Sequence, residues 1–442
     1  MLDATAYKAS IQRVDAGLSA PSRRPRVLLV AHLCNPYRGG EYGVGWHRAV
    51  ETAKYCDTWV LLSQEEPNQP DINQWLEENG PVPGLRILII PGTPSENFFK
   101  RIPGFWYLIY NRWQRRAYRV ALRLHQEQPF DLMQQVTICG YREPGYLWKI
   151  GVPFVWGPVG GTQNHPWGFF CADNGWWGAA MEALRSVINT LQMRFGRRIR
   201  LASRKAAVVL AANSTNQRDL EKYLGVKPVL MLDTGLTRVQ DGPPAKSPEA
   251  NRPFKILWSG VFAYYKGLHL LLAALSQLPP TQSYELRILG HGPLGRRWRR
   301  LAVRLGVAPR CTWLGWLPHS QAVAQYAWAD AFIFTSLRDT SGSVNLEALS
   351  YGVPVICLDH QGVGDIVTSS CGVKIPVNSP GQVIAQLRDT ILSLAKDGTH
   401  LAKLSQGALE RARHFLWSKQ GARTAEIYGQ VLKSPRPLEP RQ

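Results

Sequence analysis

The sequence has few acidic residues and no long apolar run. Its 442 residues include 32 Asp and Glu against 52 Lys and Arg, which leaves a formal net charge of +20 at pH 7. A membrane-spanning helix needs roughly 20 consecutive apolar residues, whereas runs such as Val27–Leu33 have only the length of a strand. We therefore expect a chain that does not cross a bilayer and that meets an acidic partner, such as anionic lipid, a phosphorylated substrate or nucleic acid.

Patterns typical of metal and disulfide sites are also missing. The seven cysteines lie far apart, without a C-x-x-C pair, and no two aspartates are separated by a single residue, the spacing that commonly holds Mn²⁺ or Mg²⁺. The sequence thus predicts no metal and a reducing, cytoplasmic environment. Zinc-finger spacing and RNP-like aromatic motifs are absent as well, which argues against nucleic acid as the partner.

The sequence predicts two α/β domains. Short β-branched or Leu-rich runs alternate with helical patterns, which is typical of a parallel sheet with crossover helices. A Pro- and Gly-rich stretch at 236–253 predicts a linker between doubly wound, Rossmann-like domains at 25–235 and 254–415. We expect residues 1–24 to form a flexible tail, and a helix at 416–434 to cross back to the first domain.

The most informative stretch, residues 334–356, reads FTSLRDTSGSVNLEALSYGVPVI. A strand is expected to end there in a loop, and a helix to begin after it, on the ligand side of a doubly wound sheet. Two acids eight residues apart, Asp339 and Glu347, can each accept hydrogen bonds from a pair of hydroxyls. The backbone N–H groups at the helix start could bind a phosphate; they belong to Gly342, Ser343 and Val344.

This stretch resembles the E-x7-E motif of retaining GT-B glycosyltransferases, particularly family 4, with Asp in place of the first Glu. The resemblance implies two Rossmann-like domains facing a central cleft and a nucleoside diphosphate sugar as co-substrate. By resemblance, Asp339 lies beside the donor sugar hydroxyls and Glu347 beside the ribose hydroxyls. Lys266 matches the lysine that meets the donor diphosphate as a point charge, although the arginine that usually precedes it is missing.

Other turns carry the same resemblance. Those of the second domain are expected to bind the donor through Gly260, Gly290, Gly292, Gly315 and Asp365. Two loops of the first domain resemble the family's glycine-rich loop and the V-x-G-P-x-G-G loop of exopolysaccharide and lipopolysaccharide glycosyltransferases. They are expected to line the acceptor side of the cleft through Gly39, Gly40, Glu41, Gly160 and Gly161. Many members carry a histidine where this chain has Gln134-Gln135-Val136, so no general base is assigned.

A basic aromatic segment at 98–124 suggests a membrane surface. Arginines share one helical stripe beside an aromatic one that includes Trp106, a pattern typical of interfacial helices. The arginines expected to face the membrane are Arg112, Arg116, Arg119 and Arg123. The alternative is a buried aromatic face with solvated arginines.

Three functions stay open at this point. The first is transfer of a sugar from a nucleoside diphosphate sugar to a lipid-linked or polysaccharide acceptor, with retention of configuration, at the inner face of the cytoplasmic membrane. The second, on the same fold, is a sugar-nucleotide 2-epimerase, which would need no acceptor. The third is a non-catalytic basic scaffold that binds membrane or nucleic acid.

Overall fold

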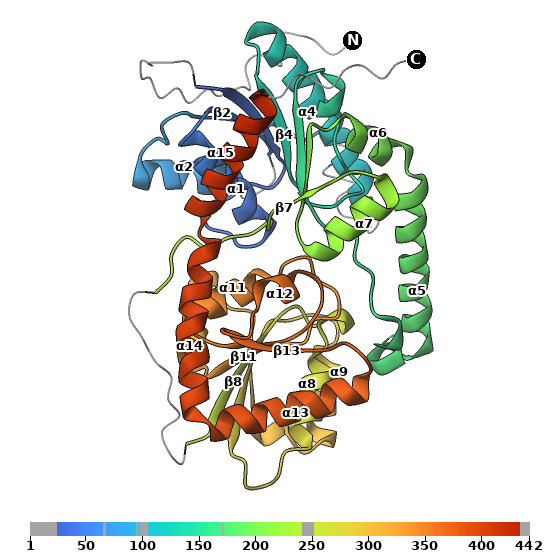
Figure 1. The fold of residues 1–442 in the computed structure, drawn as a ribbon, viewed down its shortest axis with the longest axis vertical. Coiled ribbons are helices and arrows are strands. Elements are labelled where there is room, and N and C mark those ends of the chain that lie inside the picture. Colours follow the sequence, from blue (N-terminus) through green and yellow to red (C-terminus); the bar gives the residue numbers. More distant parts are fainter. Residues whose placement is uncertain are drawn as a thin grey trace.

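The computed structural model describes residues 24–64, 68–93, 96, 105–169, 171–240 and 252–433. The predicted tail, most of the predicted linker and residues 98–104 of the basic aromatic segment lie outside these ranges. Within the described residues the chain forms two α/β domains, one above the other in Figure 1. The predicted fold class is therefore confirmed.

The first domain is built on a seven-stranded parallel sheet with the order β3-β2-β1-β4-β5-β6-β7. Its strands are β1 (Arg26–Ala31), β2 (Asp57–Ser63), β3 (Leu85–Ile90), β4 (Leu132–Thr137), β5 (Phe154–Val159), β6 (Val208–Ala211) and β7 (Val229–Leu230). Its helices are α1 (Glu41–Ala53), α2 (Asn68–Asn79), α4 (Trp106–Glu127), α5 (Cys171–Phe195), α6 (Arg197–Lys205) and α7 (Ser214–Leu224). Strands β1 and β5 are apolar along most of their length because helices cover both faces of the sheet.

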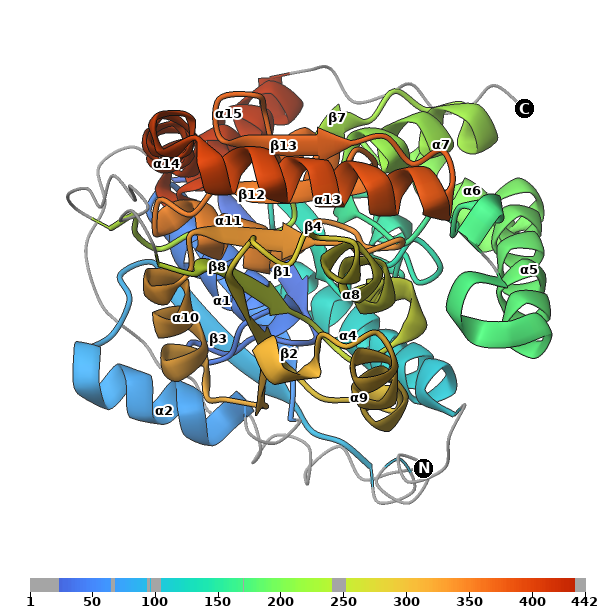
Figure 2. The ribbon, with the colours of Figure 1, turned by 90° about the horizontal axis from the view of Figure 1, so that it is seen from below.

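The second domain has a six-stranded parallel sheet with the order β10-β9-β8-β11-β12-β13. Its strands are β8 (Phe254–Ser259), β9 (Tyr284–Leu289), β10 (Cys311–Gly315), β11 (Ala331–Phe334), β12 (Val355–Leu358) and β13 (Gly372–Ile375). Its helices are α8 (Leu268–Ser276), α9 (Gly295–Arg304), α10 (His319–Trp328), α11 (Ser343–Ser350), α12 (Gln361–Ile366), α13 (Pro380–Lys396) and α14 (Gly398–Ala412). Figure 2 shows α13 lying across this domain, seen from below, with α14 nearly end-on at its side.

The last helix, α15 (Trp417–Lys433), returns to the first domain. It continues from α14 upward and packs along α1 (Figure 1). Trp417 and Tyr428 are buried in the core of the first domain, and the Tyr428 hydroxyl donates a hydrogen bond to the Gln134 side chain. Gln134 also donates to the carbonyl of Gly157, so its amide joins β4, β5 and the returning helix. The end of the chain thus couples the two domains.

Candidate functional site

Lys266 and Asp339 meet at the point where the strand order of the second sheet reverses. The sheet is built outward from β8 on one side and from β11 on the other, which opens a crevice at the carboxyl ends of these two strands. Lys266 follows β8 and Asp339 follows β11, and their side chains form an ion pair. The side chains remain 16% and 23% exposed. The pair is therefore partly shielded yet within reach of a ligand.

Gln361 fixes the backbone of the loop that carries Asp339. The Asp339 N–H donates to Gln361 Oε1 over 2.6 Å, and the Gln361 amide donates to the carbonyl of Leu337 over 3.3 Å. Gln361 has φ of +54°, a left-handed conformation that costs free energy for a residue other than glycine. Sequence analysis missed this residue, because its role depends on a backbone angle that no motif records.

Thr340, the next residue of the same loop, contacts the first domain. Gln163 Nε2 donates to Thr340 Oγ1 over 2.9 Å, and Asn213 Nδ2 donates to the Thr340 carbonyl over 2.6 Å. A Cβ on Gly160 would lie 2.5 Å from Thr340 Cγ2, so only glycine fits there. The loop 338–342 is thus held from both sides of the cleft.

The start of α11 presents backbone donors beside this loop. Gly342 has φ of +66°, which turns the chain into the helix. Ser343 and Val344 form the first turn and are partly exposed. N–H groups in a first turn have no acceptor within the helix, and the helix dipole favours an anion there. This end of α11 can therefore receive a phosphate.

Glu347 lies one turn further along α11. Its Oε2 accepts a hydrogen bond from the Tyr326 hydroxyl over 3.1 Å. Burial raises the pKa of the Glu347 carboxyl, and the nearby His319 and the Tyr326 hydroxyl oppose the rise. Gly39 of the first domain faces His319, with its would-be Cβ 3.9 Å from the ring. Glu347 therefore borders the cleft at a second place, away from the ion pair.

The glycine turns of the second domain are linked by backbone hydrogen bonds. Gly260 follows β8, Gly290 and Gly292 follow β9, and Gly315 ends β10. The N–H of Gly260 donates to the carbonyl of Leu289, and the N–H of Gly290 donates to the carbonyl of Gly315. The predicted turns thus form one continuous edge at the carboxyl ends of three neighbouring strands.

Across the cleft, Glu41 begins α1 just after Gly40. Its Oε1 accepts a hydrogen bond from the N–H of Cys139 over 3.2 Å, because β1 and β4 are neighbours at the reversal point of the first sheet. Burial raises the pKa of Glu41 to about 7, and Asp233 adds to the rise. Glu41 is therefore a carboxyl that changes charge near neutral pH.

Asp233, which sequence analysis missed, connects this side to the loop 338–342. It is buried, its carboxylate accepts a hydrogen bond from the Ser341 hydroxyl, and burial raises its pKa. Arg48 is buried nearby, lowers that pKa, and donates to the carbonyl of Leu232 over 2.6 Å.

Two residues that were predicted to bind the donor or line the acceptor side, Asp365 and Gly161, contact other parts of the protein in this structure. The Asp365 carboxylate accepts a hydrogen bond from the N–H of Ser214 over 2.6 Å, at the start of α7 in the first domain. Gly161 lies against Gly140, with a would-be Cβ 3.7 Å from the Gly140 Cα. Asp365 is thus an interdomain contact, whereas Gly161 continues the loop that meets Thr340.

The predicted interfacial stripe on α4 needs correction. Tyr110, Trp113 and Ala117 are buried in the core of the first domain, so the aromatic stripe packs inward. Arg116 forms two hydrogen bonds with the buried Glu96, at 2.5 and 2.7 Å, and does not face solvent as the predicted stripe required. Three predicted arginines are exposed, Arg112, Arg119 and Arg123, and Trp106 is 41% exposed at the start of the helix.

The structure shows a different exposed apolar face, on α5. Its residues are spaced by three and four, which places them on one side of the helix, and each is between 43% and 67% exposed. We call these residues the α5 ridge: Met181, Leu184, Val187, Ile188, Leu191 and Phe195. Exposed basic residues follow it at the end of α5 and on α6, namely Arg194, Arg197, Arg204 and Lys205. Figure 1 shows α5 at the outer edge of the molecule.

The start of α4 is a second exposed apolar surface of the first domain. Phe105, Trp106, Tyr107 and Leu108 are all exposed. In the described part of the chain, no helix is long and apolar enough to span a membrane.

No group of three His, Cys, Asp or Glu side chains that could hold a metal ion occurs among the described residues. The ion pair lies at the reversal point of the second sheet, beside the start of α11. The arrangement therefore offers a lysine and backbone N–H groups to a phosphate, and carboxylates to hydroxyl groups.

Comparison with known proteins agrees with this geometry. Residues 241–411 match the family described as "Glycosyl transferases group 1". Over 176 residues the chain is 29% identical to a D-inositol 3-phosphate glycosyltransferase of Corynebacterium efficiens, covering 38% of this chain and 40% of that protein. Over 179 residues it is 28% identical to the putative colanic acid biosynthesis glycosyltransferase WcaL of Escherichia coli, covering 39% and 43%. The matches thus span about two fifths of the length of these relatives.

The whole fold has solved counterparts. The Anabaena protein Alr3699/HepE, solved in complex with UDP, aligns with a TM-score of 0.59 at 17% identity, covering 92% of this chain and all of that one. The fold is that of the GT-B glycosyltransferases, as the sequence predicted, and the match to the group 1 family covers residues 241–411. The narrower assignment to family 4 stays a prediction.

The raised pKa of Glu41 predicts how stability depends on pH. Because the folded state holds this proton up to about pH 7, whereas an unfolded glutamate loses it near pH 4.3, the group's contribution to stability falls as pH rises through that window. Glu41→Gln should remove this loss and stabilise the protein relative to wild type by about 2 to 3 kcal/mol more at pH 8 than at pH 5. Urea unfolding at both pH values measures it, with the exposed Glu410→Gln as control. Parallel pH dependence of E41Q and wild type would contradict the prediction.

Proposed function

We propose that this chain, whose second domain matches the group 1 glycosyl transferases, moves a sugar from a nucleoside diphosphate sugar to a lipid-linked or polysaccharide acceptor, with retention of configuration. The observation that carries the proposal is the Lys266–Asp339 pair at the reversal point of the second sheet, beside the start of α11. A cation and a helix N-terminus together suit a diphosphate leaving group.

The ion pair explains how donor binding and loop geometry are connected. Before the donor binds, the carboxylate of Asp339 neutralises Lys266. A donor diphosphate would take over the lysine, which frees Asp339 to accept hydrogen bonds from sugar hydroxyls. Glu347 would accept from the ribose hydroxyls. Structural relatives bind UDP and UDP-glucose, which supports a nucleotide sugar as the donor.

The acceptor would bind on the side of the first domain. The proximity of Gly39 to His319 and of Gly160 to Thr340 supports a place opposite the donor edge for the loops at Gly39-Gly40-Glu41 and Gly160-Gly161. The α5 ridge and the start of α4 belong to the same domain and suit a bilayer surface, with apolar side chains for the lipid and adjoining arginines for anionic headgroups. A lipid-linked acceptor at the cytoplasmic face of the membrane would thus meet the cleft.

The epimerase alternative differs in one measurable respect. An epimerase releases free nucleotide from the donor alone, whereas a transferase consumes an acceptor in proportion to the nucleotide released. Measuring the nucleotide released with and without an acceptor therefore distinguishes the two functions.

Substitutions in the proposed donor site should lower either turnover or nucleotide binding. Lys266→Ala should lower turnover, and Glu347→Gln, which keeps an acceptor for Tyr326, should weaken nucleotide binding, each by about 1.5 to 3 kcal/mol. Calorimetric titration with the donor and initial rates measure the two effects. The controls are Lys396→Ala and Glu410→Gln, which change exposed residues on α13 and α14. If the cleft variants bind and turn over like the controls, the site assignment is wrong.

The mechanism predicts that transfer proceeds without a metal and retains the anomeric configuration of the donor sugar. Lys266 and the start of α11 supply the positive charge that a metal would otherwise provide. Rates should therefore be unchanged by EDTA, and NMR of the product should show the anomeric proton in the donor's configuration. Loss of activity in EDTA with rescue by Mn²⁺, or an inverted product, would refute this part of the proposal.

The α5 ridge predicts membrane binding that salt does not fully remove. Leu184→Gln combined with Leu191→Gln should lower partitioning onto anionic vesicles at least tenfold, because each leucine contributes about 1.5 to 3 kcal/mol when it is buried in lipid. Vesicle co-sedimentation at low and high salt measures it. The matched control changes two exposed apolar residues elsewhere, Leu230→Gln and Val303→Gln. Equal sedimentation of the two double variants would show that the ridge does not contact lipid.

A further inference from the structure

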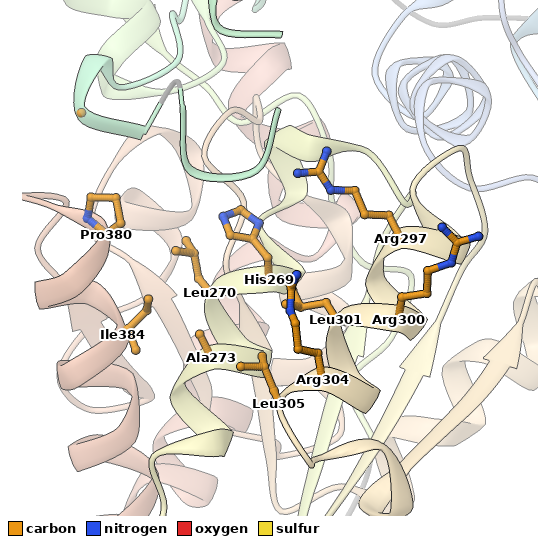
Figure 3. Close-up of a pocket in the computed structure, with 11 residues that line it drawn as sticks. His269, Leu270, Ala273, Arg297, Arg300, Leu301, Arg304, Leu305, Pro380 and Ile384 are labelled. Carbon is orange, nitrogen blue, oxygen red and sulfur yellow. The ribbon is translucent and has the colours of Figure 1, made fainter. Parts of the chain in front are cut away.

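A cavity of about 800 Å³ lies on the second domain, away from the residues of the donor site (Figure 3). Helices α8, α9 and α13 form its walls, and Gly168 of the first domain lies at its rim. The rim is held in place because Phe169, the next residue, is packed into the core of the second domain. The cavity is therefore a defined feature of the closed two-domain arrangement.

One wall of the cavity is strongly basic. Arg297, Arg300 and Arg304 line it from α9, and their spacing of three and four residues places them on one face of that helix. Figure 3 shows Arg297 and Arg304 directed toward the part of the cavity that contains His269, with Arg300 directed further outward. None of the described lining residues is Asp or Glu. The described part of this wall therefore favours an anion.

The remaining walls are aliphatic. Leu270 and Ala273 come from α8, Leu301 from α9 and Ile384 from α13. Among the described lining residues there is no Phe, Tyr or Trp, so none of them offers an aromatic ring on which a nucleobase could stack. A hydrocarbon chain would instead bury apolar surface against these side chains. The cavity thus combines an anion-binding wall with a wall for an alkyl group.

We propose that this cavity binds a lipid phosphate, with the phosphate monoester between the α9 arginines and the first carbons of the chain against Leu270, Leu301 and Ile384. Guanidinium groups match phosphate oxygens in geometry and charge, and several arginines suit the two charges of a monoester better than the single charge of a phosphodiester. The site is separate from the donor cleft, so it stands or falls independently of the transferase assignment.

The test uses soluble probes and the full chain without a donor. Dodecyl phosphate below its micelle concentration should bind wild type, and inorganic phosphate should bind at least about tenfold more weakly because it lacks the chain. Arg297→Gln with Arg304→Gln should weaken dodecyl phosphate by about tenfold or more. The matched control, Arg296→Gln with Arg299→Gln, removes the same charge from residues of α9 that do not line the cavity. Calorimetry measures affinity, and thermal unfolding checks that both variants fold.

Further probes test the hydrocarbon chain and the phosphate of the ligand separately, and distinguish a phosphate monoester from a phosphodiester lipid. Ile384→Ser should weaken dodecyl phosphate without changing inorganic phosphate, and the neutral dodecyl maltoside should not compete. Dihexanoyl phosphatidylglycerol, a phosphodiester, should bind more weakly than dodecyl phosphate. The proposal is overturned if inorganic phosphate binds as tightly as dodecyl phosphate, if the phosphodiester binds more tightly, or if the two arginine double variants lose affinity equally.

Discussion

The loop at 338–342 is the constraint on which the rest of the site depends. Asp339 holds Lys266 within the second domain, while the neighbouring Thr340 is held by Gln163 and Asn213 of the first. The hydroxyl of Ser341, the next residue, donates a hydrogen bond to the Asp233 carboxylate. A short segment thus carries the carboxylate of the ion pair together with several hydrogen bonds between the domains. Any change in the relative position of the domains must move this segment, so under the proposed function donor binding and domain position are coupled.

Much of this could be predicted from the sequence because the governing patterns are local. The strands alternate with helices at short range, and the residues Lys266, Asp339 and Glu347 sit at recognisable distances from strand ends. Once two sheets are assumed, the reversal of strand order places the ends of β8 and β11 together, and with them the ion pair. The alternation of strands and helices had already restricted where these three residues could lie. The family resemblance then added the role expected of each.

What could not be predicted depends on contacts between distant segments. The aromatic stripe of α4 has the spacing of an interfacial helix and equally that of a core helix; burial against the first sheet decided for the core, and Glu96 drew Arg116 inward. The α5 ridge has the same periodicity, but no element in the described ranges covers it, and this depends on the tertiary arrangement. Gln361 and Asp233 act through a backbone angle and a hydrogen bond across more than 100 residues.

The central claim is that the cleft binds a nucleoside diphosphate sugar, and thermal unfolding in the presence of UDP, GDP, ADP and their sugars tests it most directly. A ligand that binds only the folded protein stabilises it by about 2.7 kcal/mol at 100 times its dissociation constant. The account predicts that one nucleoside diphosphate and its sugar raise the unfolding temperature of wild type, and that Lys266→Ala removes most of the shift. No shift with any of these ligands, or an equal shift in the variant, would contradict it.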